Sequence, residues 1–457
     1  MGFDGFVLIG EKRIPYSFDN EEITLFFGSL PDTVPDGLDV LMTQHVECMT
    51  SKCTMFKLAT PLQNDCIIKE NGSEKAVSSF NQVYAVDFRI ENYGQDSKYT
   101  KMCVSFPELD YFCPSEKMCN VYLGKAEFIR CPICAMRGAI RYRGTDVIVE
   151  LGTSASIELK AKASAKTETK LVLTFPETSD FSYITGLYHA IKNFFCFVCN
   201  RQNIALHQVV LIGDCLEKRM KDKKLIEERR YLKSRFIPAE KYIEPDESID
   251  EISKTTRYEC YKTHFIELLQ MFFERELGEN ALVGASAMHA SVKYRNFIDL
   301  KQSLHITAAF EYYVRTILPE MHSQEAITFY NEMSTWVDKF IEENSGDLKR
   351  RAKKFKKKLS PYMSLSEKLQ KVIDGYPGWE PIKPALKDWF GNDYASLANV
   401  ANDWRNELAH EKRTYEPDIN TVDAVRLVEH LNYSIILRKA GYNTEEISNI
   451  LENTLVR

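Results

Sequence analysis

The pattern of hydrophobic and polar residues changes about halfway along the chain. In residues 1 to about 215, short alternating or β-branched runs are separated by Gly, Asn, Asp and Pro, which is typical of strands joined by turns. These runs are DGFVLIG, YAVDFRI, TDVIVELG, SIELKAKA and TKLVLTF. DFSYITGLYHAIKNFFCFVCN predicts one helix in this half, and IALHQVVLIGD after it predicts another strand. We therefore expect a β-rich N-terminal domain over residues 1–215.

The second half has helical periodicity almost throughout. Hydrophobic residues recur every three or four positions in YKTHFIELLQMFFEREL, NFIDLKQSLHITAAFEYYVRTIL and SQEAITFYNEMSTWVDKFIEEN, and again on both sides of Pro417. A charged segment with two prolines precedes this half, and we interpret it as a linker over residues 216–256. The predicted fold class is α+β, with an all-α bundle over residues 257–457.

The helix before Pro417 carries the candidate catalytic residues, in ANDWRNELAHEKRTYEPD. Asn406 and His410 lie four residues apart and share one face of this helix, and Arg405 lies between that face and the buried one. Pro417 ends the helical pattern, so His410 is expected in the last turns, facing outward. The residues expected on the buried face are Leu397, Val400, Ala401, Trp404 and Leu408.

An ordinary explanation also exists for these polar residues. Cationic side chains near a helix C-terminus interact favourably with the helix dipole. An Arg followed by a His at similar spacing occurs three more times, at Arg201–His207, Arg257–His264 and Arg315–His322. Spacing alone therefore does not identify a site. The distinguishing context is Asn406 directly after the arginine, on the outward face of a strongly patterned helix.

In that context RNELAH resembles the HEPN ribonuclease motif, Arg-polar-x-x-x-His. ITAAFEYYVRTIL resembles an early helix of the same family that carries an inward Glu, which is Glu311 here. The order of a β-rich domain, a helix and a helical bundle resembles the ApeA-type abortive infection proteins of bacteria. Segments similar to their N-terminal domain are DGFVLIGEKRIPYSF, FPELDYF and the helix–strand unit at 180–214.

The residue types fit metal-independent RNA cleavage. Such a reaction must deprotonate the ribose 2′-OH, stabilise the charge that grows on phosphorus and protonate the departing 5′ oxygen. His410 titrates near neutrality and is our candidate general acid or base. Arg405 keeps its charge and its planar fork fits phosphate oxygens, while Asn406 would orient the imidazole or the phosphate. Glu311 is either an acid of this site or a surface acid paired with Arg315 one turn later.

The resemblance implies more than the residues do. It implies an endoribonuclease that gives 2′,3′-cyclic phosphate and 5′-OH ends and acts on tRNA at the anticodon loop. It also implies a trigger, a phage-encoded protein that the N-terminal domain senses. It also implies a homodimer with a composite site. Arg405 and His410 diverge by roughly 140° around an ideal helix, so two facing motifs would surround a phosphate better than one. The alternative is a non-catalytic HEPN module that binds RNA, a nucleotide or a partner protein.

Charge and composition limit the kinds of partner that the protein is expected to bind. With 59 basic and 65 acidic residues the net charge is -6, so nucleic-acid binding needs a local patch. LKRRAKKFKKKL is dense in positive charge, and Lys353, Lys354, Lys356 and Lys357 are candidate RNA contacts, although such runs are often solvated helix faces. No apolar run reaches the ~18 residues of a membrane span, and the N-terminus lacks a signal-peptide pattern, so we expect a cytoplasmic protein without membrane contact.

The cysteines raise the question of zinc. A cytoplasmic chain with 12 cysteines is expected to keep them as thiols or metal ligands. RCPICAMRG supplies Cys131 and Cys134, and FFCFVCN supplies Cys196 and Cys199. These pairs are candidates for one structural zinc site, with simple burial of the second pair as the alternative. No HExxH or carboxylate cluster predicts a catalytic metal, so we expect catalysis without a cofactor.

Overall fold

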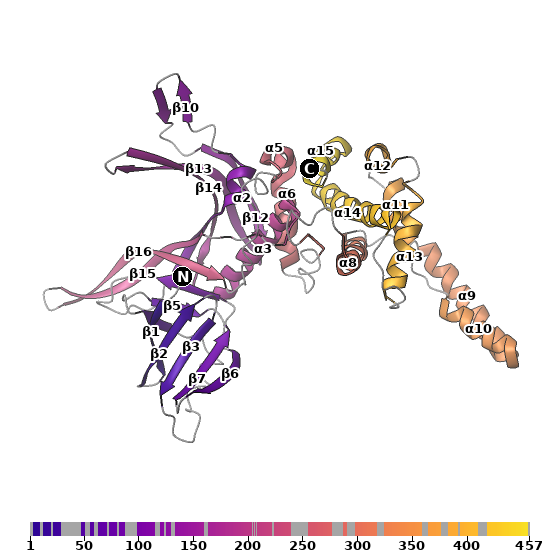
Figure 1. Ribbon diagram of the computed structural model, residues 1–457, viewed down its shortest axis with the longest axis horizontal. Helices are drawn as coiled ribbons and strands as arrows, with labels where there is room; N and C mark the ends of the chain where they lie inside the picture. The colour runs from indigo at the N-terminus through magenta and orange to yellow at the C-terminus, as the bar shows by residue number, and fades with distance from the viewer. Residues whose placement is uncertain are drawn as a thin grey trace. The chain divides into compact units, whose positions relative to one another are not determined.

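The computed structural model divides the chain into two compact units, which are described separately (Figure 1). The sheet unit comprises Met1–Phe195, Asn203–Arg257 and Phe272–Leu277, and the helical unit comprises Cys196–Gln202, Tyr258–Met271 and Gly278–Arg457. The residues that the structure describes are 3–9, 12–19, 22–28, 47–50, 55–58, 63–70, 73–79, 82–86, 98–114, 119–122, 125–128, 133–159, 163–202, 204, 206, 208–221, 224–238, 255–276, 287–289, 298–317, 324–358, 364–375, 383–391, 394–409 and 418–455.

Fourteen of the described strands form one antiparallel sheet in the order β12-β13-β14-β9-β15-β16-β8-β5-β4-β1-β2-β3-β7-β6. Their bounds are β1 Phe3–Ile9, β2 Lys12–Asp19, β3 Glu22–Gly28, β4 Glu47–Thr50, β5 Met55–Leu58, β6 Gln63–Glu70, β7 Ser73–Ser79, β8 Gln82–Val86, β9 Lys98–Ser105, β12 Ile133–Tyr142, β13 Thr145–Leu159, β14 Ala163–Thr178, β15 Gln208–Lys221 and β16 Lys224–Pro238. A separate hairpin pairs β10 (Cys119–Tyr122) with β11 (Lys125–Phe128).

Alternating side chains give the sheet its buried face. Along β13, Val147, Val149 and Leu151 are fully buried while the residues between them are partly exposed. The first four turns of the helix α3 (Phe181–Cys199) belong to this unit. The ring of Phe195 on α3 makes edge-on contacts with Phe106, which precedes the helix α2 (Pro107–Phe112), and with Phe112 at the end of α2. A Cβ at Gly186 on α3 would lie 1.9 Å from the hydroxyl of Tyr142, so a larger residue there would displace the buried Tyr142 ring.

The predicted linker is wrong over its first half. β15 continues to Lys221 and pairs in register with β16, from Val209 opposite Phe236 to Lys221 opposite Lys224. The charged side chains of this segment suggested a linker, yet strand pairing is made by backbone groups and tolerates charged side chains. A smaller difference concerns SIELKAKA, which spans the end of β13 and the start of β14 rather than forming one strand.

The helical unit confirms the predicted helices and adds others between them. It contains α5 (Tyr258–Tyr261), a 3-10 turn η2 (Lys262–His264), α6 (Phe265–Glu276, whose end belongs to the sheet unit), α8 (Leu300–Ile317), α9 (Gln324–Glu343), α10 (Gly346–Lys358), α11 (Leu365–Asp374), α12 (Lys383–Phe390), α13 (Leu397–Ala409), α14 (Ile419–Ala440) and α15 (Thr444–Thr454). The fold is therefore α+β, as predicted. None of the described helices is long and apolar enough to cross a membrane.

The central helix of this unit is α14, which packs against α8 and α13. It buries fifteen of its residues, polar ones among them, as expected for a helix enclosed by its neighbours. Asp418 caps its N-terminus by accepting a hydrogen bond from the backbone N–H of Thr421 at 2.8 Å. Gly441 ends it at φ 109°, and a Cβ there would lie 3.0 Å from Nδ1 of His264.

Candidate functional site

The helix α13 presents Arg405 at the edge of its buried face. Ala398, Ala401 and Trp404 are buried, so the core-facing stripe is centred on these three residues. Of the other residues predicted for that stripe, Leu397, Val400 and Leu408 are only half-buried. Arg405 follows Trp404 by one position and is half-buried, as expected for a residue beside the stripe.

A carboxylate from a different helix meets this arginine. Glu311 lies on α8 next to the fully buried Phe310, and its Oε2 is 3.2 Å from Nη2 of Arg405. The two side chains are 32% and 36% exposed, respectively, so the pair lies at the border between core and solvent. Arg315, the other predicted partner of Glu311, is exposed. Of the two interpretations of Glu311, the geometry favours the one that places it beside the motif.

The neighbouring asparagine completes the described part of the cluster. Nη1 of Arg405 donates to Oδ1 of Asn406 at 3.3 Å, and Asn406 is half-buried. α13 ends at Ala409, and His410 lies outside the described residues. The structure thus brings together Glu311 on α8 with Arg405 and Asn406 on α13, although Glu311 and Arg405 are 94 positions apart in the chain.

The cluster holds a guanidinium in a fixed orientation. One nitrogen of the fork contacts the carboxylate of Glu311 and another contacts the amide of Asn406, which limits rotation of the Arg405 side chain. A guanidinium carries five N–H donors, so two such contacts leave donors for an oxyanion at the half-exposed edge. The arrangement is suited to binding a phosphate group rather than a metal, because its only anionic group is already paired with a cation.

Residues 304–446, which include Glu311, Arg405 and Asn406, match the family model described as Apea-like HEPN. These residues form an Apea-like HEPN domain. The match extends from α8 to the start of α15 and covers just under a third of the chain. HEPN domains are generally ribonucleases. No curated protein and no solved structure matches the chain.

The predicted RNA contacts of the HEPN domain lie on α10. Lys353 and Lys354 are exposed, whereas Lys356 forms an ion pair with Asp338 on α9. Lys357 lies within the helix, but its side chain is outside the described residues. Lys353 and Lys354 are therefore the better candidates for contacts with a phosphate backbone.

The four cysteines of the predicted zinc site are placed as follows. Cys134 is exposed on β12, and its thiol donates to the carbonyl of Met136 at 3.2 Å. Cys196 and Cys199 are buried at the end of α3, where the Cys196 thiol donates to the carbonyl of Gln202 at 3.4 Å. Cys131 lies outside the described residues. No group of three or more His, Cys, Asp or Glu suited to a metal occurs in the described part of the chain, and zinc stays a prediction.

The sequence reasoning missed a buried polar network in the HEPN domain and its surroundings. Glu429 on α14 accepts hydrogen bonds at Oε1 from Nδ2 of Asn200 at 3.2 Å and contacts Nε2 of His289 at 3.0 Å. Nδ1 of His289 lies 2.9 Å from Nε2 of Gln302. If that amide donates, His289 carries its proton on Nε2 and donates it to Glu429. The available signal was RLVEHLNYSIIL, in which Glu429, His430, Asn432 and Ser434 interrupt an apolar run.

Charge on Glu429 is stabilised despite its burial. Desolvation alone would raise the pKa of Glu429, but its interactions with His289, His430 and Asn200 together outweigh that effect and hold the pKa below its usual value. Burial lowers the pKa of His430, whose ring lies against Trp389. Glu429 therefore carries a buried negative charge that links α14 to the end of α3.

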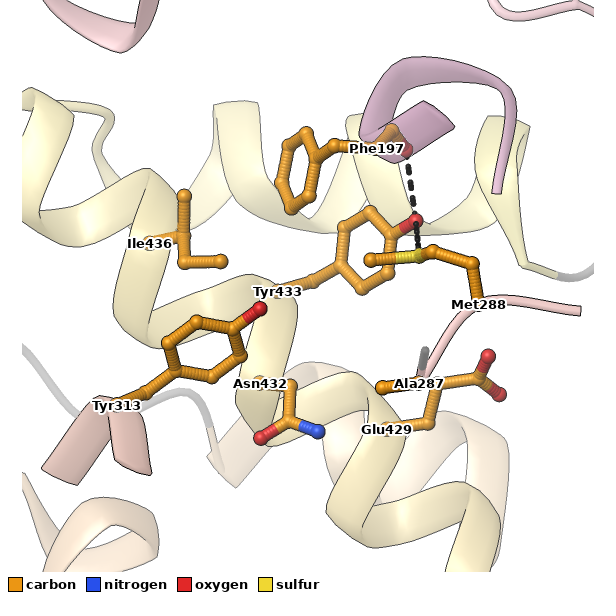
Figure 2. A pocket seen from close by; sticks show the side chains of 8 residues that line it. All are labelled: Phe197, Ala287, Met288, Tyr313, Glu429, Asn432, Tyr433 and Ile436. Atoms are coloured by element: carbon orange, nitrogen blue, oxygen red, sulfur yellow. Dashed lines mark hydrogen bonds between the residues drawn. The ribbon is translucent and has the colours of Figure 1, made fainter. Parts of the chain in front are cut away.

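Figure 2 shows a small cavity beside this network. It is lined by Phe197, Ala287, Met288, Tyr313, Glu429, Asn432, Tyr433 and Ile436. Its volume is about 10 Å³, which is room for about one water molecule. The hydroxyl of Tyr433 donates to the carbonyl of Phe197 at 2.7 Å, and the two rings stack with centroids 4.4 Å apart. The cavity is too small for a substrate, so this region has a structural role.

Proposed function

We propose that the protein is an anti-phage endoribonuclease whose HEPN domain cleaves RNA without a metal. In this proposal the helical unit forms the nuclease domain, and the sheet unit forms a domain that senses infection and restrains the nuclease. The observation that carries the proposal is the contact between Glu311 and Arg405 within a segment that matches Apea-like HEPN. It supports an arginine held ready for a phosphate, five residues before His410 in the sequence.

The proposed roles follow from the chemistry of each group. Arg405 stabilises the negative charge that grows on phosphorus, where a fixed charge is worth more than a mobile one. His410 transfers the protons as general acid or base, and the products would be 2′,3′-cyclic phosphate and 5′-OH ends. Asn406 orients the phosphate or the imidazole. Glu311 positions Arg405 through their ion pair.

The substrate, trigger and assembly are finer parts of the same proposal. We infer tRNA as the substrate, cut at the anticodon loop, where bases are unpaired and accessible. The trigger would be a phage-encoded protein, and the active form a homodimer in the cytoplasm. The exposed Lys353 and Lys354 on α10 support RNA binding through phosphate contacts.

The rival proposal is a HEPN module that binds RNA, a nucleotide or a partner protein without cleaving anything. The variant His410→Ala separates the two. When it is expressed beside the wild type, loss of toxicity with RNA affinity retained supports catalysis. Equal toxicity of the two proteins supports the binding module. Asn402→Ala, on a half-buried position of the same helix outside RNELAH, is the matched control and should keep the toxicity of the wild type.

A further inference from the structure

The helices α9 and α10 pack together as a helical hairpin (Figure 1). This hairpin exposes large apolar side chains. Phe329 is 64% exposed, Trp336 60%, Leu348 56% and Phe355 49%. They are four of the six large hydrophobic residues that are exposed among the residues that the structure describes. Such a concentration on one hairpin marks an interaction surface.

Both helices present these side chains as stripes. Phe329 and Trp336 are seven residues apart on α9, and Leu348 and Phe355 are seven residues apart on α10, so each pair lies on one face of its helix. The ring of Trp336 stacks on Phe340 one turn later, with centroids 5.7 Å apart and planes at 26°. Phe340 therefore extends the aromatic part of the α9 stripe by one turn beyond Trp336.

Helical geometry places the two stripes on the same side of the hairpin. Val337 is the buried residue of α9, and Trp336 is rotated from it by about 100°. On α10, Phe355 is rotated by about 60° in the same sense from Ala352, which is half-buried. The two helices are antiparallel, so side chains that are rotated in the same sense from the contact between the helices lie on the same side of the hairpin. Trp336 and Phe355 therefore share one side. The ion pair between Asp338 and Lys356 then lies toward the other side.

The two helices carry opposite charge. α9 has five acidic residues and one basic residue, whereas α10 has eight basic residues and one acidic residue. A face with an apolar centre, one acidic helix and one basic helix complements a second copy of itself. If the two-fold axis runs parallel to the helices, α9 of each copy lies on α10 of the other. A perpendicular axis would instead place acidic helix on acidic helix and basic on basic.

We propose that this face of the α9–α10 hairpin binds a second copy of the chain and forms an antiparallel four-helix bundle. The contact between Asp338 and Lys356 brings Phe355 to within about one turn of the height of Trp336. The two-fold axis parallel to the helices preserves that height, so Trp336 of one copy meets Phe355 of the other. Lys353 is rotated by about 150° from the stripe of α10 and stays accessible to RNA.

This interface does not depend on RNA cleavage, so it can be tested by measuring the mass of the protein in solution without an activity assay. Sedimentation velocity of the full chain between about 1 and 100 µM gives the dissociation constant of the dimer. Trp336→Glu places a charge in the centre of the contact and should raise that constant at least about tenfold. The control is Thr335→Glu, an adjacent exposed position on α9 that lies off the stripe and should change the constant less than about twofold.

A reciprocal pair makes the test specific. Phe355→Lys alone should also weaken the dimer, whereas Trp336→Glu combined with Phe355→Lys should recover much of the affinity through a Glu–Lys contact between copies. Circular dichroism checks that each variant is folded. A wild-type monomer at 100 µM, or an unchanged constant for Trp336→Glu, would overturn the proposal. So would weaker RNA binding by Trp336→Glu at unchanged mass, because the stripe would then hold RNA.

Discussion

Glu311→Gln removes the charge of the residue that contacts Arg405 and keeps its shape. The amide oxygen can still accept a hydrogen bond from the guanidinium, so the change isolates the electrostatic part of the contact. At a separation of 3.2 Å, with both side chains about one-third exposed, solvent screens much of the attraction. The ion pair should therefore contribute only about 0.5–1 kcal/mol to the free energy of unfolding.

The expected effect on cleavage is larger than the effect on folding. Without the carboxylate, the Arg405 side chain samples several rotamers and is less often aligned with the scissile phosphate. We expect cleavage to fall by roughly 10- to 100-fold, equivalent to about 1.4–2.7 kcal/mol in activation free energy. Arg405→Ala removes the charge itself and should cost roughly 10²- to 10³-fold.

The assay counts 5′-hydroxyl RNA ends in infected cells at equal expression, and urea unfolding of the purified variants measures stability. If Glu311 acts only through Arg405, Glu311→Gln should change the count less than about twofold in the Arg405→Ala background. Arg315→Gln, an exposed position one turn along α8, is the control and should behave as the wild type. Full activity of Glu311→Gln, or an equal loss in both backgrounds, would refute the positioning role.

Three further predictions concern α10, the buried network and zinc. Lys353→Glu with Lys354→Glu should weaken RNA binding and reduce the slope of log affinity against log salt by about 2, while Lys339→Glu on α9 should not; equal slopes would contradict phosphate contacts. Glu429→Gln should lower the free energy of unfolding by about 1–3 kcal/mol at pH 7. The folded-state pKa of Glu429 is depressed, so the difference in stability between the wild type and Glu429→Gln is fully present above the unfolded-state pKa, near 4.3. The difference should shrink as the pH falls from there through the folded-state pKa. A constant difference down to about pH 3 would argue against a buried carboxylate. Elemental analysis of protein purified without chelator should find about one zinc per chain if the four cysteines bind it, and less than about half would exclude the site.

The local pattern of α13 predicted the most about the site. The spacing of Trp404 and its apolar neighbours placed Arg405 beside the buried face, and the structure agrees. The partner of Glu311 remained open, because a contact across 94 positions depends on how α8 packs against α13. The local sequence shows Arg315, which lies one turn from Glu311 on the same helix. It does not show Arg405, which reaches Glu311 from another helix.

Two other features lay beyond reasoning from local patterns. The segment from Leu216 to Phe236 has the charge of a linker but pairs as two strands, because the backbone rather than the side chains provides the pairing. In the sequence, Glu429 stands among apolar residues without a visible partner, and only the fold brings His289 and Asn200 to it. In both cases the decisive partners come from elsewhere in the chain.

The central claim is that the HEPN domain cleaves RNA with His410 and that infection releases this activity. The most direct measurement is sequencing of small RNA, with chemistry that captures 5′-hydroxyl ends, from bacteria expressing the wild type or His410→Ala with and without phage. We predict new ends clustered in tRNA loops that depend on His410 and increase after infection. No His410-dependent ends across several phages, from a protein shown to be folded and expressed, would contradict the claim.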